Sequence, residues 1–359
     1  MYVNSGTRKQ PVDDPSNDLF TVVGQQSVAF GLSREKKFGI VPSSIFSTLS
    51  DDNSELRARA HAAEELKLLV ENCRDVHLVE PHFDDFVEFL GDLLDDHNSK
   101  VSTAVVDVIS ALVQQMSKEL LSSKAKLLVT KLCRRLGDTN GVVRVSVTKT
   151  FTHLMRVASA ATVLDSLCTA GISHRNARVR QETLNLAIIA LLTFPSSDFD
   201  LPRVAKTVAV ALIDGRRPVR QAALECYAVL AQAMGPSKRS FLMDNVSGVA
   251  LQYGIGHELM DAVIARLSNR QLPKHNSSGL IEYVALLNRC GGTATPTPDL
   301  EWILSASSGH GSSAVSDGSA SSRRSSQSST PGDFQPFEAS RLRRSGRRGF
   351  ARLPWDSEV

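Results

Sequence analysis

Arginine and aspartate recur at a fixed spacing in this chain, and these two side chains can form bidentate, charge-assisted pairs. The phrase Asp138–Arg144 (DTNGVVR) returns as Asp214–Arg220 (DGRRPVR), with an arginine six residues after the aspartate in both copies. Weaker copies stand at 95–101 (DDHNSKV) and 173–180 (SHRNARVR). Most of the other charged positions in these phrases hold arginine or lysine. Cationic groups repeated in this way can bind carboxylates, on the chain itself or on a partner.

The spacing of the phrases identifies the elements that carry them. Their anchor valines, Val101, Val143, Val179 and Val219, are 42, 36 and 40 residues apart. A period of ~40 residues is typical of HEAT-type solenoids, in which each unit is two helices around a short turn. One turn per unit then lies along one edge of the solenoid, which favours a binding ridge over a catalytic pocket. In HEAT repeats the turn aspartate and the later arginine often bond to neighbouring repeats as a ladder, so we assign Arg144, Arg180 and Arg220 to the structure.

Apolar residues at three-and-four spacing predict five helical pairs and a less regular sixth unit at 238–267. The pairs are expected at 43–49 with 55–73, 83–94 with 101–116, 124–136 with 142–157, 162–172 with 179–192, and 204–213 with 219–234. After the sixth unit, the apolar stretch 279–287 is expected to cover the exposed end of the solenoid. The predicted fold is therefore all-α, a solenoid of about six helical pairs with disordered flanks.

Composition sets the domain boundaries. Apolar residues make up 42% of the 359 residues, but both ends lack periodic apolar pattern. We predict a flexible segment at 1–36, the helical domain at 37–290, and a tail at 291–359 that is first Ser/Gly-rich and then Arg-rich. The tail composition cannot bury enough apolar surface to offset ordering entropy, so it is predicted to be disordered. The net charge is only +3, so any charge preference of the helical body depends on how its charges are arranged.

Catalysis, metal binding and membrane insertion have no support in the sequence. It contains no phosphate-binding glycine loop, no nucleophile elbow and no HExxH pair. The five scattered cysteines form no CxxC pair, which indicates reduced thiols in a cytosolic-type compartment. No secretory signal is visible, and no apolar run approaches the ~20 residues that span a bilayer. We expect a non-enzymatic protein without metal or cofactor.

Several segments resemble the TOG domain, a module of six HEAT repeats that binds the αβ-tubulin heterodimer along its intra-repeat turns. Within that family the chain is most similar to the second TOG domain of the crescerins, regulators of axonemal microtubules. The segments that carry the resemblance are 37–42 (KFGIVP), 63–67 (AEELK), 198–202 (DFDLP), 211–214 (ALID), 219–225 (VRQAALE), 228–231 (AVLA), 262–267 (AVIARL) and 353–356 (LPWD). The resemblance implies a flat, paddle-shaped solenoid and a tubulin- or microtubule-binding function without enzymatic activity. It also implies location in the cytoplasm on the cytoskeleton, at the cilium, axoneme or basal body.

Carried over by position, the resemblance puts the tubulin-facing turns at 51–57, 96–101, 138–142, 174–178 and 214–218. Many family members have a large aromatic residue in the first turn, where this chain has Leu56, and a basic residue in the third, where it has Asn140. The predicted tubulin-binding residues are Leu56, Arg57, Lys100, Asn140, Arg175, Arg178, Arg216 and Arg217. A row of cations on adjacent turns suits the acidic surface of tubulin. Because a single exposed ion pair contributes only ~0–1 kcal/mol, several turns must act together.

Two other functions stay open at this stage. The first is a HEAT-repeat adaptor that uses the same edge for a different acidic protein, favoured by Leu56 and Asn140. The second is a nucleic-acid binder that uses the basic tail, with the solenoid as a scaffold. The Arg-rich stretch 341–348 (RLRRSGRR) is also suited to the acidic tails of tubulin, as a secondary contact.

Overall fold

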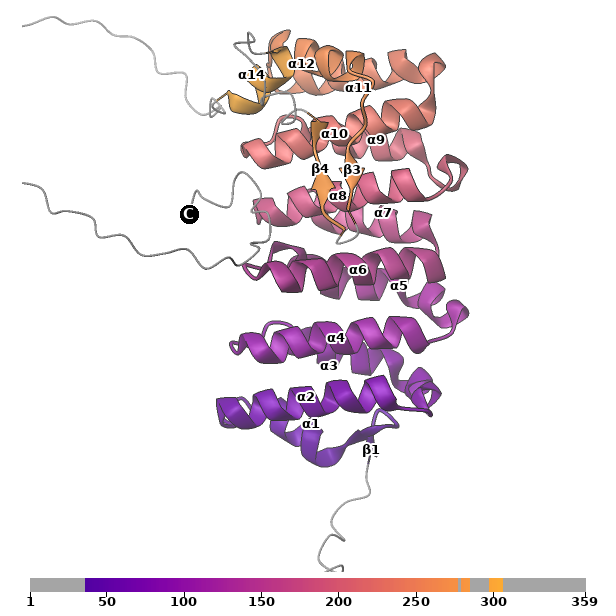
Figure 1. The fold of residues 1–359 in the computed structure, drawn as a ribbon, viewed down its shortest axis with the longest axis vertical. Helices are drawn as coiled ribbons and strands as arrows, with labels where there is room; N and C mark the ends of the chain where they lie inside the picture. The colour runs from indigo at the N-terminus through magenta and orange to yellow at the C-terminus, as the bar shows by residue number, and fades with distance from the viewer. Residues whose placement is uncertain (1–35, 277–278, 285–296, 306–359) are drawn as a thin grey trace, which may run out of the picture.

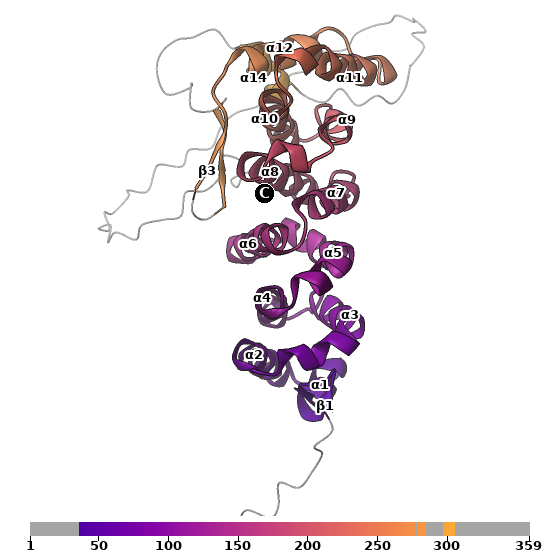
Figure 2. The same ribbon diagram turned by 90° about the vertical axis from the view of Figure 1, so that its right-hand side faces the viewer.

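Helices stack in two layers along the long axis of the molecule. The computed structural model describes residues 36–276, 279–284 and 297–305. The second helices of the pairs form one layer, and the first helices form the other (Figures 1 and 2). Helices pack against their partners within a repeat and against the corresponding helix of the next repeat, for example α2 on α4 and α3 on α5. This is the predicted HEAT-type solenoid.

The layer of second helices contains α2 (Leu56–Asn72), α4 (Ser99–Gln115), α6 (Gly141–Val157), α8 (Ala177–Thr193) and α10 (Arg217–Met234). The layer of first helices contains α1 (Ser43–Ser50), α3 (Phe83–Leu93), α5 (Lys118–Cys133), α7 (Ala160–Gly171) and α9 (Leu201–Ala211). The sixth pair is α11 (Arg239–Gln252) with α12 (Glu258–Ser268). Within the described residues, four 3-10 segments join repeats or extend helices: η1 (Val76–His82), η2 (Arg134–Gly137), η3 (Ser196–Asp198) and η4 (Pro236–Lys238). The five predicted pairs are all present, with ends that differ by a few residues.

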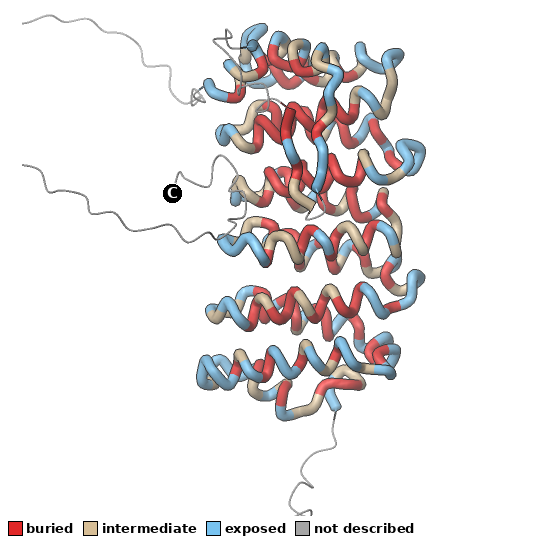
Figure 3. The backbone as a smooth tube through the Cα atoms, viewed as in Figure 1, coloured by how far each residue is buried: buried red, intermediate tan, exposed pale blue. Residues whose placement is uncertain are grey.

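The core runs continuously between the layers (Figure 3). The anchor valines Val101, Val143, Val179 and Val219 are buried, as their position in the repeat predicts. Burial of a valine-sized side chain stabilises a fold by ~1.5–3 kcal/mol, so one anchor per repeat helps hold successive helices in register. Exposed residues gather instead at the helix ends, including the turns within repeats (Figure 3).

A small hairpin starts the solenoid. Strands β1 (Lys36–Lys37) and β2 (Val41–Pro42) pair antiparallel around a turn that contains Gly39. Gly39 has φ +81°, and a Cβ there would lie 2.4 Å from the carbonyl oxygen of Leu78, so no other residue fits without a shift. The turn places Phe38 against three further rings of this end of the core, Phe46, Phe86 and Phe89.

A second hairpin follows the sixth pair and corrects one prediction. Strands β3 (Lys274–His275) and β4 (Ile281–Glu282) pair antiparallel and lie along the outer side of the second-helix layer, across α10 and α8 (Figures 1 and 2). The hydroxyl of Tyr283 donates to Asn185 Oδ1 at 2.6 Å, and the Val284 N–H donates to Glu225 Oε1 at 3.2 Å. The expectation that 279–287 covers the end of the solenoid is therefore wrong for its described residues, because buried polar groups of α8 and α10 bind this segment to the flank.

Helix α14 (Pro298–Leu304) corrects another prediction. It lies within the tail predicted to be disordered, yet it packs on α12 and α10 with Ile303 buried. Seven residues are too few to show a helical period in the sequence. The hydrogen bonds that hold α14 in place are made with residues far away in the chain, so they form only in the folded protein. The rest of the predicted tail and segment 1–35, including the Arg-rich stretch 341–348, lie outside the described residues.

Candidate functional site

The turns inside repeats one to five form one edge of the solenoid, which we call the turn edge (left in Figure 1). It comprises 51–55, 94–98, 134–140, 172–176 and 212–216, together with the first residues of α2, α4, α6, α8 and α10. All five helix N-termini point toward this edge. Their unpaired N–H groups and macrodipoles favour negative charge there.

The middle turns share a capping pattern that explains why these residues form a turn. In the third turn, Asp138 Oδ1 accepts from the Asn140 N–H at 2.7 Å, and Asn140 Oδ1 accepts from the Val142 N–H at 3.0 Å. The second turn does the same with Asp96 and Asn98. Side-chain caps of this kind stabilise a helix start by ~1 kcal/mol. Asn140, predicted to contact a partner, therefore has a structural task as well, although its side chain is exposed.

The fourth turn uses a histidine for the same purpose. His174 Nδ1 accepts from the Asn176 N–H at 3.1 Å, where the other turns use a carboxylate. Asn176 Oδ1 then caps α8 through the Arg178 N–H at 2.9 Å. The histidine removes one negative charge from this turn while keeping its geometry.

Arginines of the second helices tie adjacent turns together. Arg180 donates to its own turn, at the carbonyl of His174, and grips Asp214 of the next turn with two bonds of 2.6 and 2.9 Å. Arg59 repeats this arrangement with the carbonyls of Leu49 and Asp51 and the carboxylate of Asp96. The predicted ladder is confirmed for Arg180, and Arg59 belongs to it as well.

We call each such connection between neighbouring turns a rung of the ladder, and two rungs depart from the pattern. The second repeat has Ser102 in place of the arginine, and Arg135 of η2 fills the gap by donating to Ser102 Oγ at 3.0 Å and pairing with Asp138. Arg144 binds the Asp138 and Thr139 carbonyls of its own turn only, because the next turn carries His174 instead of an aspartate. A second basic side chain, Arg178, donates back to the Asp138 carbonyl at 3.3 Å, so it joins turns four and three.

The last rung holds α14. Arg220 is 2% exposed; it donates to the Asp214 carbonyl of its own turn and to the carbonyls of Ile303 and Ser305 at 2.7 and 2.6 Å. Burial lowers the pKa of its guanidinium, and the negative end of the α14 dipole offsets part of that desolvation. The Trp302 indole N–H fixes the same helix by donating to the Leu212 carbonyl at 2.9 Å.

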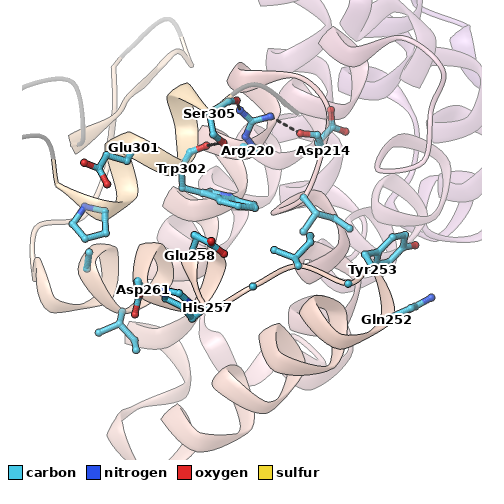
Figure 4. Close-up of a pocket in the computed structure, with 17 residues that line it drawn as sticks. Asp214, Arg220, Gln252, Tyr253, His257, Glu258, Asp261, Glu301, Trp302 and Ser305 are labelled. Atoms are coloured by element: carbon cyan, nitrogen blue, oxygen red, sulfur yellow. Dashed lines mark hydrogen bonds and ion pairs between the residues drawn. The ribbon is translucent and has the colours of Figure 1, made fainter. Parts of the chain in front are cut away.

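Helix α14 also forms one wall of a cleft of about 1290 Å³ beyond the fifth turn (Figure 4). The opposite wall is the segment from Gln252 to Asp261, with Tyr253, His257 and Glu258 along it. Aromatic and apolar groups are mixed here with exposed carboxylates, among them Glu301. The cleft ends the turn edge and separates it from α12.

The cations predicted to meet a partner stand at the starts of the second helices. The exposed ones are Arg57, Lys100, Arg175, Arg216 and Arg217. None of their side chains makes an ion pair within the described part of the chain. Arg178, the sixth predicted cation, is partly buried by its inter-repeat bond.

The charges at the starts of the second helices destabilise these helices. None of α2, α4, α6, α8 or α10 has an acidic residue in its first turn, whereas α3, α5 and α12 do. A cation at a helix N-terminus is unfavourable by ~0.3–1 kcal/mol, so the turn edge concentrates positive potential from both dipoles and side chains. The aspartates of turns two, three and five are held by arginines, which leaves the exposed cations dominant in the later turns.

The first turn differs from the others in charge. Asp51, Asp52 and Glu55 are exposed there beside Arg57. The Asn53 N–H donates to Asp51 and lowers the pKa of that carboxyl below its usual value. The edge is therefore acidic at the first turn and basic at the fourth and fifth.

Two exposed apolar side chains interrupt the polar edge. Leu56 is 63% exposed at the first turn, and Val142 is 68% exposed at the third. Leu56 was among the predicted contacts; Val142 was not, although it immediately precedes the anchor Val143. The residue before the anchor valine is Lys100, Arg178 or Pro218 in the other repeats, and that comparison could have identified Val142 as exposed.

The described residues contain neither a metal site nor a disulfide nor a membrane-spanning helix. Within 36–276, 279–284 and 297–305, no group of three His, Cys, Asp or Glu side chains could hold a metal ion. The cysteines Cys73, Cys133, Cys168 and Cys226 are free thiols. Over the same residues, no helix has the length and apolar run needed to cross a bilayer.

Comparison with known proteins identifies relatives of this chain. The family model of the CLASP N-terminal domain matches residues 87–252. TOG array regulator of axonemal microtubules protein 1 of Homo sapiens is 33% identical over 326 residues, which are 90% of this chain and 18% of that protein. Crescerin-like protein che-12 of Caenorhabditis elegans is 26% identical over 284 residues, 77% of this chain and 22% of that protein. The chain thus spans about a fifth of the length of the curated relatives it matches.

One solved structure is similar to this chain in both fold and sequence. It comes from work stating that crescerin uses a TOG domain array to regulate microtubules in the primary cilium. It superimposes with a TM-score of 0.62 at 34% identity, covering 69% of this chain and 98% of the other. The overlap accounts for nearly all of that TOG domain.

Proposed function

This chain belongs to the TOG-domain family, with crescerins among its relatives, and from that premise we propose that its turn edge binds αβ-tubulin. The observation that carries the proposal is the set of five second-helix N-termini on one edge, none with a first-turn acid and four of them beside exposed cations that make no ion pair within the described residues. Tubulin surfaces are acidic, so complementary potentials accelerate and orient the encounter. The role is non-catalytic.

The fourth and fifth turns carry the main electrostatic contact in this proposal. Arg175, Arg216 and Arg217 are exposed there, and the carboxylate of Asp214 is already bound by Arg180. Guanidinium groups bind carboxylates in bidentate fashion, which adds specificity to the attraction. Leu56 at the acidic first turn and Val142 at the third turn supply apolar contacts.

The ladder gives the edge its rigidity. Each turn is bonded to its neighbour through Arg59, Arg135, Arg178 or Arg180, so the spacing between cationic groups is preset before binding. A preorganised edge loses little conformational freedom on association, which increases the net affinity.

The cellular role follows from the relatives. We propose that the chain acts on axonemal microtubules in cilia, by favouring their assembly or setting their length. The Arg-rich stretch 341–348 would add a second contact, with the acidic tails of tubulin. A second contact on the same chain converts weak binding into avidity.

The test is co-sedimentation and size exclusion of the full chain with αβ-tubulin and with stabilised microtubules, at low and high salt. Binding that weakens with salt supports the turn edge, because exposed charges are screened. The same assay on a chain ending at Ser305 separates edge from tail: tubulin binding largely survives the deletion if the edge carries it. Loss of all binding on deletion would move the function to the tail.

A further inference from the structure

A second charged surface lies away from the turn edge, on the outer side of the second-helix layer. It is a groove of about 730 Å³ lined by α4, α6, α8 and the hairpin β3–β4, and we call it the α6 groove. The hairpin approaches α6 closely, since a Cβ on Gly279 would lie 3.2 Å from Thr148 Cγ2. The hairpin stands out from the second-helix layer (Figure 2), and its residues His275, Asn276 and Gly279 line the groove.

Three basic side chains run along the floor of the groove. Lys149, His153 and Arg156 lie on α6 at positions i, i+4 and i+7, so they share one face of the helix. His275 of the hairpin lines the groove as well. None of these four side chains has a hydrogen bond or ion pair to another described residue.

Negative charge is missing from the same surface. No aspartate or glutamate is among the described residues that line the groove; its other polar groups are hydroxyls and amides, such as Thr152 and Gln114. The carboxylate that Ser146 contacts, Asp107, is already paired with Lys67 at 3.3 Å. Cations without counter-charges, set beside hydroxyl donors, form an anion-binding surface.

The spacing of the basic side chains along α6 indicates which kind of anion fits the groove. At ~1.5 Å rise per residue, Lys149 and His153 are ~6 Å apart along α6, and Lys149 and Arg156 ~10 Å. Side chains on one face of an extended peptide recur every ~7 Å. Acidic residues at alternate positions of an extended segment therefore meet these basic side chains in turn, with the long arginine side chain covering the remaining offset.

Other anions fit the groove less well. The basic side chains are spaced along a helix and do not converge on one point, as binding of a single phosphate group requires. No phenylalanine, tyrosine or tryptophan is among the described lining residues, so the groove offers nucleic-acid bases no stacking platform. We propose that the α6 groove binds an extended acidic peptide segment of a partner protein, independently of the turn edge.

The experiment uses the full chain and a fluorescein-labelled octaglutamate peptide, followed by anisotropy. Lys149→Glu with Arg156→Glu is compared with Lys126→Glu and Arg239→Glu, two exposed residues of α5 and α11 on the other layer. Both double variants change the net charge equally, so any general effect on the Arg-rich tail is the same. We expect the α6 variant to raise the Kd at least tenfold and the control variant to change it less than twofold. Equal changes in the two would overturn the proposal.

Two further measurements keep the result specific. Octaglutamate is expected to protect the Lys149 amine from acylation, read by mass spectrometry, while Lys126 stays reactive; unprotected Lys149 contradicts the proposal. The milder pair Lys149→Ala and Arg156→Ala, checked by circular dichroism, replaces the glutamate pair if that one fails to fold. An octathymidylate oligonucleotide that binds as tightly as octaglutamate, and through the same residues, would show a nucleic-acid surface instead. None of these readouts involves tubulin, so failure here leaves the turn-edge proposal untouched.

Discussion

Arg180 of α8 grips Asp214 across the boundary between repeats four and five, with Nε–Oδ2 at 2.6 Å and Nη2–Oδ1 at 2.9 Å. The third nitrogen of the guanidinium binds the His174 carbonyl of its own turn. One side chain therefore fixes both the shape of its own turn and the distance to the next. Arginine thus has two roles on this edge: some arginines bond neighbouring turns, and others are exposed cations. Only the position of each arginine in the repeat decides which role it has.

Removing this rung is expected to destabilise the solenoid. Arg180→Ala leaves Asp214 partly buried without its cation, and breaking such a pair costs about 3 kcal/mol. Arg203→Ala is the matched control, because Arg203 pairs with Asp165 on the surface, where a pair contributes ~0–1 kcal/mol. Urea unfolding followed by circular dichroism measures both. Equal losses in the two variants would contradict a structural role for the rung.

Reversing the charge of the fifth turn is expected to weaken tubulin binding without affecting the fold. Arg216→Glu with Arg217→Glu alters two exposed side chains that have no ion pair in the described structure, so thermal unfolding stays near that of the parent. We expect the affinity for αβ-tubulin, measured by size exclusion and anisotropy, to fall at least tenfold. Lys126→Glu with Arg239→Glu carries the same change in net charge on other surfaces. If tubulin binding is unchanged in the fifth-turn variant, the edge assignment is wrong.

An aromatic residue in the first turn is expected to tighten the complex. Leu56→Trp enlarges an exposed apolar contact at the position where many TOG domains carry an aromatic residue. An aromatic contact contributes ~0.5–1.5 kcal/mol beyond its area, which is a few-fold in affinity. Leu68→Trp is the control, since Leu68 is 50% exposed but lies in the C-terminal half of α2, away from the turn edge. A similar gain from both variants would indicate nonspecific adhesion.

Loss of Arg220 is expected to release α14. Arg220→Met removes the donor to the Ile303 and Ser305 carbonyls while filling much of the same volume. In a Trp355→Phe background Trp302 is the only tryptophan, because the chain has two. We expect its emission to shift to longer wavelength as the indole becomes exposed, with far-ultraviolet dichroism close to the parent. Unchanged emission would mean that packing alone holds α14.

Stability is expected to fall above pH ~8.5. Burial raises the pKa of the Cys133 thiol to about 11 and that of Cys168 to about 12, whereas thiols of unfolded chains ionise near ~8.5. The folded state keeps these protons longer, so the stabilisation is complete below pH ~8.5 and is lost as the pH rises toward 11 and 12. Urea midpoints between pH 8 and 11 measure the slope, and Cys133→Ala is expected to reduce it. Cys73→Ala, at a half-buried site, serves as the control and should leave the slope closer to that of the parent.

The helices were predictable because their pattern is local. Apolar spacing and the repeated turn phrases identified five pairs, with errors of a few residues at the ends, where capping decides the boundary. The α5 start at Lys118, earlier than predicted, is an example: Ser122 and Ser123 interrupt the apolar pattern, yet Leu121 before them is buried and belongs to the helix. Helix α14 and the flank hairpin were missed, because their partners lie about 80 to 100 residues away in the chain.

The residues of the turn edge were predictable as a set, but their individual tasks were not. Arg178 and Arg175 look alike in the sequence, yet one donates to the preceding turn and the other is exposed. Arg135 lies outside the repeated phrase and still completes the rung that Ser102 leaves open. These assignments depend on distances between repeats, which no local pattern contains.

The sequence by itself determined the solenoid, its period and the edge on which the turns gather, because helix period, capping residues and anchor valines act over a few residues. Only the tertiary structure decided which cations are bonded and which are exposed, where the chain after α12 runs, and that α6 and the hairpin share a basic groove. The physical reason is the same in each case: hydrogen bonds and burial between segments far apart in sequence exist only once the repeats have stacked.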